Sequence, residues 1–262
     1  MDAGYRTPLL DFFRRGEVAR DVRLLAAQGG MAPRAHEQLG LLMVLVDDSD
    51  PEIAAAAEHT LGSIPRASLS AFLARSDVST DMREFFLKRG IEPADVPAAD
   101  IDMPIVDTAP EDEPQPEAAG DLSDEEKHES ALNKIASLGV AQRVALAMKG
   151  SREERGILIR DPNKIVGAAV LSSPKMTDSE AEAISKMANV SEDILRIIAH
   201  TRAWVKNYNI VIALSKNPKT PVAVSMNLLS RLNEKDLRML STDRNVPDVL
   251  RMTARKKIVM DK

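Results

Sequence analysis

The 262-residue sequence predicts an all-α protein in which short helices stack into a right-handed α-solenoid with two halves. Apolar residues recur with the period of an α-helix in one stretch after another, and part of the C-terminal half repeats itself further along the chain. An acidic, proline-rich segment separates the halves. We therefore expect an N-terminal helical domain at 1–91, a disordered linker at 92–122 and a C-terminal helical-repeat domain at 123–262.

Three stretches of the N-terminal half show the helical period clearly. In 17–28 the apolar side chains that begin with Val18 fall on one side of a helix, and in 35–46 they follow the i, i+3, i+4, i+7 pattern from Leu39. The alanine-rich stretch 52–64 carries a third stripe of this kind. No convincing strand alternation is present, and the residues typical of sheets are sparse. Each stretch is therefore expected to form a helix with one apolar face.

The C-terminal half contains an internal repeat. When 156–193 is placed on 212–249, one constant shift aligns Leu158 with Leu214 and one Asx-Pro pair with another, without a gap. A third related copy precedes the linker and begins at Asp50. Such self-similarity is typical of helical-repeat proteins.

Each copy divides into two units of about 28 residues. A proline or a capping serine marks the start of a helix at four regularly spaced positions: Pro162, Ser191, Pro218 and Pro247. One unit has room for two short helices, for example 163–173 and 178–188. Because a unit of this size cannot bury its apolar stripe alone, neighbouring units must stack, which predicts the solenoid.

Two kinds of segment resemble known repeats. Residues 49–61, with Asp-Pro, an aliphatic position, alanines and a closing leucine, resemble the second helix of a HEAT repeat. Residues 214–221, which contain Asn-Pro-Lys-Thr-Pro, and residues 245–250 resemble the related leucine-rich-repeat variant. The resemblance covers roughly 20–90 and 135–258. It implies a helical scaffold that binds proteins or nucleic acids, and it implies no catalytic residue.

The net charge of −5 is the sum of three unlike parts. Residues 1–91 carry 11 basic and 13 acidic side chains, 92–126 carry no basic and 13 acidic ones, and 127–262 carry 24 and 14, which gives −2, −13 and +10. Residues 92–120 also hold six of the fifteen prolines. Since proline removes backbone donors and like charges repel, we expect a solvated spacer. The alternative is an acidic strip that lies against the basic half and competes with an external polyanion.

The composition excludes several classes of protein. With no cysteine, the chain cannot form a disulfide framework, a thiolate nucleophile or a cysteine-based zinc or iron–sulfur site. No run approaches the roughly 18 apolar residues of a transmembrane helix, and the first residues lack the apolar core of a signal peptide. We therefore expect a cytoplasmic protein that does not insert into a membrane.

Motifs that carry catalysis or bind metals are missing from the sequence. The histidines lie far apart and are each expected to be structural or solvated: His36, His59, His128 and His200. The acidic run 47–50 resembles the start of a calcium loop only superficially, and acids that favour a helix N-terminus explain it better. Asp193 and Asp248 each precede an arginine by three positions and are expected to form salt bridges. We expect no enzyme, no metal and no cofactor.

Basic side chains recur at the turns between helices in register with the repeat, so stacking would bring them to one edge. One cation also lies near two aromatic residues. The candidates for binding a partner or a polyanion are Arg160, Lys164, Trp204, Lys206, Lys216 and Lys219. Such an edge could hold a phosphate backbone and stack a base. The alternative is that the lysines are solvated and the tryptophan packs between units.

Two functions remain open. The first is a non-enzymatic adaptor or scaffold whose repeat surface binds a partner protein, with exposed side chains such as Met226, Met239 and Met252. The second is a nucleic-acid-binding protein that uses the basic half, with the acidic linker as an internal competitor. A steep loss of affinity with salt would distinguish the second from the first. The oligomeric state is not predicted.

Overall fold

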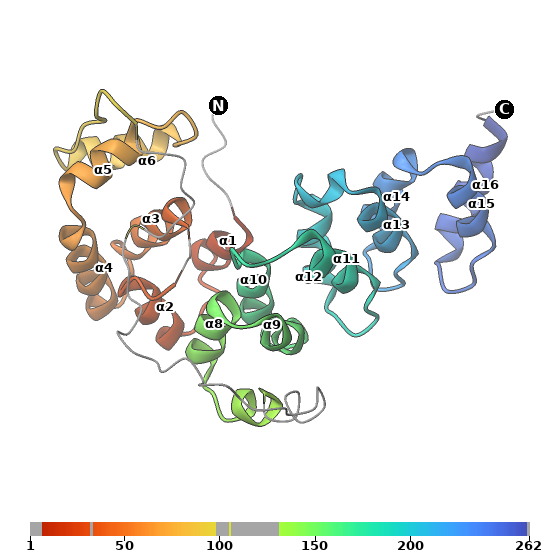
Figure 1. The fold of residues 1–262 in the computed structure, drawn as a ribbon, viewed down its shortest axis with the longest axis horizontal. Helices are drawn as coiled ribbons and strands as arrows, with labels where there is room; N and C mark the ends of the chain where they lie inside the picture. Colours follow the sequence, from red (N-terminus) through yellow and green to blue (C-terminus); the bar gives the residue numbers. More distant parts are fainter. Residues whose placement is uncertain (1–6, 32–33, 98–104, 106–130, 261–262) are drawn as a thin grey trace, which may run out of the picture. The chain divides into compact units, whose positions relative to one another are not determined.

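The computed structural model describes residues 7–31, 34–97, 105 and 131–260 (Figure 1). Every regular element within these residues is a helix, and none of them lies in a strand, which confirms the all-α class. The expected linker at 92–122 falls mostly outside the described residues. The chain divides into two compact units, Met1–Arg155 with Ser172–Pro174 and Gly156–Leu171 with Lys175–Lys262.

Seven labelled helices lie wholly in the first unit: α1 (Pro8–Arg14), α2 (Arg20–Ala27), α3 (Ala35–Leu45), α4 (Pro51–Ser63), α5 (Arg66–Leu73), α6 (Thr80–Lys88) and α8 (Val140–Lys149). The expected helices at 17–28, 35–46 and 52–64 correspond to α2, α3 and α4. Helix α3 packs against α1, α2 and α4, and α2 also packs against α8. This last contact places α8 in the first unit, so the division between units falls later than the boundary expected from the acidic segment.

Local chemistry explains where α4 begins and where α6 ends in the first unit. Asp50 caps α4 by accepting a hydrogen bond from the N–H of Glu52 at 3.0 Å, and Pro51 occupies the first helical position. Gly90 follows the C-terminus of another helix, α6, and has a φ of +74°. The N–H of Ile91 then donates to the carbonyl oxygen of Phe86 at 3.0 Å. Only glycine adopts this backbone conformation without strain, so the helix stops there.

The remaining helices are α9 (Arg152–Leu158) and α10 (Lys164–Ser172), which each have residues in both units, and α11 (Asp178–Lys186), α12 (Glu192–His200), α13 (Tyr208–Lys216), α14 (Val222–Leu228), α15 (Glu234–Thr242) and α16 (Asp248–Met260). Two short 3₁₀ helices, η1 (Trp204–Lys206) and η2 (Leu229–Arg231), precede α13 and follow α14. The helices expected at 163–173 and 178–188 correspond to α10 and α11.

The shift that places 156–193 on 212–249 also relates corresponding helices. It carries the first residue of α9 onto that of α13, that of α11 onto that of α15 and that of α12 onto that of α16, whereas α14 begins slightly later than α10 would predict. Helix α13 packs against both α11 and α15, and α14 packs against α16. In Figure 1, α11 to α16 form the teal to blue part of the chain. The aligned residues Leu158 and Leu214 are both buried, so the repeat in the sequence is a repeat of the apolar core.

Close contacts join α10 to α12 within the second unit. A Cβ atom added to Gly167 on α10 would lie 2.6 Å from the Cδ1 atom of Ile194 on α12, so the glycine lets the two helices approach. Lys164 and Asp193 form an ion pair between the same helices at 2.7 Å, and Asp193 also pairs with Arg196 at 3.0 Å. The expected salt bridges of the two repeat aspartates are confirmed, since Asp248 likewise pairs with its neighbouring arginine.

Candidate binding groove

An open groove of about 380 Å³ lies between α11 and α13 in the second unit. Its walls come from the exposed side of both helices and from the turn that follows α13. The lining residues are Glu182, Lys186, Asn209, Ile212, Ala213, Lys216, Asn217 and Pro218. Because α13 packs directly on α11, the groove follows from the stacking of one two-helix unit on the next.

The turn at one end of the groove is held by a single amide side chain. The Nδ2 atom of Asn217 donates to the carbonyl oxygens of Ser185 and Met187, at 2.8 and 2.9 Å, where α11 ends. Its Oδ1 atom accepts a hydrogen bond from the N–H of Lys219 at 2.9 Å. Asn217 is buried, so these bonds are shielded from competing water. The asparagine therefore fixes the end of α13 against the end of α11.

The two lysines of the groove differ in whether a carboxylate balances their charge. Lys186 and Glu182 form an ion pair at 2.6 Å, and the hydrogen bond from the lysine lowers the pKa of Glu182 below its ordinary value. Lys216 is half-buried and has no carboxylate within ion-pair distance in the part of the chain that the structure describes. One ammonium group of the groove is therefore left without a compensating charge. Beside it lie the apolar surfaces of Ile212, Ala213 and Pro218.

Of the basic and aromatic residues that the sequence singled out, Lys216 lines the groove and Lys219 is exposed in the turn beside it. Lys206 is exposed at the end of η1. Trp204 begins the same 3₁₀ helix and is half-buried, so it neither fills a core fully nor presents its whole ring to solvent.

The other two candidates have contacts of their own. Lys164 forms the ion pair with Asp193 described above. Arg160 is exposed, and its Nη2 atom lies 3.8 Å from the sulfur of Met187. The ammonium group of Lys164 therefore already has an acidic partner, and the ion pair joins α10 to α12.

Most of the lining residues were not candidates from the sequence, among them Glu182, Lys186 and Asn209. Helices α11 and α13 have the same length, and Lys186 and Lys216 are the last residue of each, so the two lysines are equivalent in the structure. The repeat in the sequence would not have found Lys186. The two lysines are 30 residues apart, whereas the unit has about 28, so the period leads from Lys216 to Ala188.

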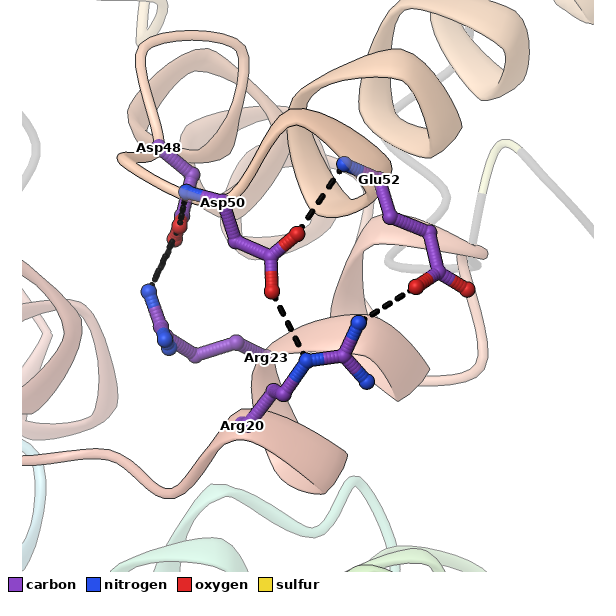
Figure 2. Close-up of polar contacts among 5 residues, drawn as sticks. All are labelled: Arg20, Arg23, Asp48, Asp50 and Glu52. Carbon is purple, nitrogen blue, oxygen red and sulfur yellow. Dashed lines mark hydrogen bonds and ion pairs between the residues drawn. The ribbon is translucent and has the colours of Figure 1, made fainter.

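The acidic run at 47–50 forms an ion-pair network rather than a calcium loop (Figure 2). Arg20 donates from Nε to Asp50 at 2.7 Å and also pairs with Glu52, while Arg23 Nη1 lies 2.6 Å from both carboxylate oxygens of Asp48. The hydrogen bond from Arg20 lowers the pKa of Asp50. These carboxylates join α2 to the start of α4, as acids at a helix N-terminus.

The histidines lie in separate places. His36 is buried against Phe72, with 4.7 Å between ring centres, and its Nε2 atom lies 3.8 Å from Asp77. His59 is exposed on α4, and a ring nitrogen of His200 lies 2.7 Å from the carbonyl oxygen of Arg196. His128 falls outside the described residues. Among the residues that the structure describes, no group of three or more acidic or histidine side chains is placed to hold a metal ion.

The methionines expected at the surface differ from one another. Met239 and Met252 are exposed, but Met226 on α14 is half-buried because that helix packs against α13 and α16. Across the described ranges, the helices are too short or too polar to cross a membrane. Comparisons with protein-family models, with curated proteins and with solved structures found no match.

Proposed function

We propose that the chain is a non-enzymatic scaffold of HEAT-like helical units that binds a partner protein through the groove between α11 and α13. The groove carries this proposal, because it combines apolar surface, one unbalanced ammonium group and an amide in one place. An open groove of this kind suits a peptide segment of another protein. No serine, threonine or cysteine stands among its lining residues to act as a hydroxyl or thiol nucleophile.

An α-solenoid is the arrangement we propose for the helical units. Two observations support it. One constant shift along the sequence relates three pairs of helices, and α13 packs on both of its neighbours, α11 and α15. In a solenoid, each unit contacts the units before and after it, and grooves recur between them. The groove would then be one of a series along the stack.

The side chains of the groove favour a particular kind of peptide. Ile212, Ala213 and Pro218 offer a surface for an apolar side chain, and the ammonium group of Lys216 is available to a carboxylate. Because Lys216 is half-buried, its interaction with an acidic group is less screened than that of a fully exposed lysine. A segment with an acidic residue beside an apolar one fits this chemistry.

A nucleic acid fits the second unit less well. Binding of a phosphate backbone relies on several cations that are free to displace counterions. Lys164 pairs with Asp193 and Lys186 pairs with Glu182, so two of the cations near the repeat turns already have acidic partners. Binding of RNA or DNA by the second unit would therefore overturn the proposal.

Site-directed photo-crosslinking tests the proposal. A photoreactive amino acid at Lys219, beside the groove, is expected to attach the chain to a discrete protein in cells that express it. Lys216→Glu should abolish the adduct, because it replaces the unbalanced cation with an anion. Glu182→Gln should strengthen it, because the change frees Lys186 from its ion pair.

The matched control is Lys88→Glu, which makes the same charge change at an exposed lysine of α6 in the first unit and should leave the adduct unaltered. An adduct with RNA or DNA in place of protein would support the nucleic-acid function. An adduct that ignores both groove variants would remove the groove from the proposal.

A further inference from the structure

Helix α16 has two apolar faces, of which only one is covered. The buried face contains Leu250 and Ala254, which pack toward α14 and α15. On the opposite side of the helix, four large apolar side chains are exposed and form what we call the outer face of α16. They are Val249 (56% exposed), Met252 (68%), Val259 (74%) and Met260 (74%).

This pattern differs from that of an ordinary surface helix. A surface helix has one apolar stripe and a polar opposite side, whereas a helix that is apolar on both sides is typically buried. Helix α16 (blue end of Figure 1) therefore has, besides its buried side, an exposed apolar side that suits a covering neighbour.

The charges on the helix indicate the chemistry of the missing neighbour. Lys256 is exposed in the middle of the outer face, between Met252 and Val259. Arg255 is exposed next to it, and its Nε atom donates to the carbonyl oxygen of Ser241 at 3.2 Å. A covering surface must therefore bring acidic groups together with apolar ones.

Two other occupants fit less well. A second copy that paired α16 with α16 about the centre of the outer face would place Lys256 against Lys256, which like-charge repulsion opposes. A helix that lies on a membrane usually presents Trp, Phe or Leu side chains, whereas the apolar side chains of the outer face are all valine or methionine. Methionine is instead typical of surfaces that adapt to partner proteins.

We propose that the outer face of α16 binds an acidic amphipathic α-helix of a partner protein. The interaction is helix against helix, with the partner's apolar stripe on Val249, Met252 and Val259 and its carboxylates near Lys256. This inference rests on the proposed function for the class of partner, but it uses a surface separate from the groove. Each surface is therefore tested by its own variants.

The probe is a synthetic helical peptide of about 18 residues, with leucines on one stripe and glutamates on both sides of it. Its binding to the full chain is measured by fluorescence anisotropy. A second peptide has lysines in place of the glutamates, and a third has the acidic composition in scrambled order. We expect the acidic amphipathic peptide to bind at least about tenfold more tightly than either of them.

Met252→Gln with Val259→Gln should weaken this binding by at least about tenfold. Lys256→Glu should reverse the preference, so that the lysine peptide binds better than the glutamate peptide. Val222→Gln changes an exposed apolar residue of α14 and serves as the control. The loss caused by Met252→Gln with Val259→Gln should persist when Lys216→Glu is also present. The probe also has the acidic and apolar groups expected in the groove, so this background separates the outer face from the groove. Every variant is compared with the unaltered chain by circular dichroism, because changes at the protein surface should leave the helices intact.

The proposal is overturned if the scrambled peptide binds as well as the amphipathic one, or if the preference survives Lys256→Glu. Sedimentation that shows a dimer abolished by Met252→Gln would assign the face to a second copy instead. Binding to anionic lipid vesicles that is lost in the same variant would assign it to a membrane surface.

Discussion

The amide nitrogen of Asn217 donates a hydrogen bond to the carbonyl oxygen of Ser185, 2.8 Å away and on the preceding two-helix unit. The same position in the aligned copy is Asp161, and both side chains accept a hydrogen bond from the N–H two positions later. Only the asparagine can donate as well. It therefore links the end of α13 to the end of α11 and fixes the turn at the end of the groove.

Replacing Asn217 should destabilise the second unit. We expect Asn217→Asp to lower the free energy of unfolding by about 2 kcal/mol, because the carbonyls of Ser185 and Met187 lose their donor and face a carboxylate instead. Urea denaturation measures the change. Asn245→Asp, at an exposed turn position, should cost far less, and equal costs would show that the cross-unit bond contributes nothing.

Charge on the repeat stripe should unfold the C-terminal helices. Leu214 is fully buried on α13, so Leu214→Asp places an unpaired carboxylate in the core at a cost of about 4 kcal/mol or more. Circular dichroism should show a loss of helix. The same change at exposed Met239 should leave the helical signal intact, and a fully helical Leu214→Asp protein would mean that the apolar face of α13 is misassigned.

The contact between Gly167 and Ile194 can be tested with a pair of variants. Gly167→Val adds side-chain atoms where the Cδ1 atom of Ile194 lies, and overpacking of this kind should cost about 1–3 kcal/mol. Ile194→Val removes that Cδ1 atom. Thermal unfolding of the double variant should therefore show a smaller loss than the sum of the two single losses. Strict additivity would argue against close packing of α10 on α12.

Asp77 should make the stability of the first unit depend on pH in the acid range. Two hydrogen bonds from Arg75, at 2.7 and 3.0 Å, lower the pKa of Asp77, and the charge of nearby His36 acts in the same direction. Because the folded pKa is lowered, the stabilisation is present above the unfolded pKa of about 4 and is lost as the pH falls through the folded value.

Asp77→Asn should therefore reduce the free energy of unfolding more at about pH 5 than at about pH 3, as measured by urea denaturation. The same change at exposed Asp95 is the control and should give a small, nearly constant difference. A loss for Asp77→Asn that does not shrink in acid would show that the ion pair is not its cause.

Much of the fold could be read from local patterns. The helices at 17–28, 35–46 and 52–64 were predicted from the spacing of their apolar residues, and their ends follow from caps such as Asp50. These signals act between residues three or four apart, so they are complete within each segment. The alignment of 156–193 with 212–249 likewise marks corresponding helices from the sequence alone.

The candidate site was only partly predictable. Lys216 was a candidate because of its register in the repeat. Its ammonium group is the unbalanced charge of the groove because Glu182 pairs with the other lysine, Lys186, one turn away on α11. Trp204 was expected either on a binding ridge or in the core, and its half-buried place in η1 follows from how η1 sits beside α12 and α13.

The sequence by itself determined the helices, their repeat and the basic character of the C-terminal half. Only the tertiary structure decided that α8 packs with α2, that Lys186 and Lys216 share one groove, and that the outer face of α16 stays uncovered. The physical reason is the sequence separation between the residues that specify each feature. A helix is specified by neighbours within one turn, whereas a groove is specified by side chains far apart in the sequence, which meet only when two helices pack.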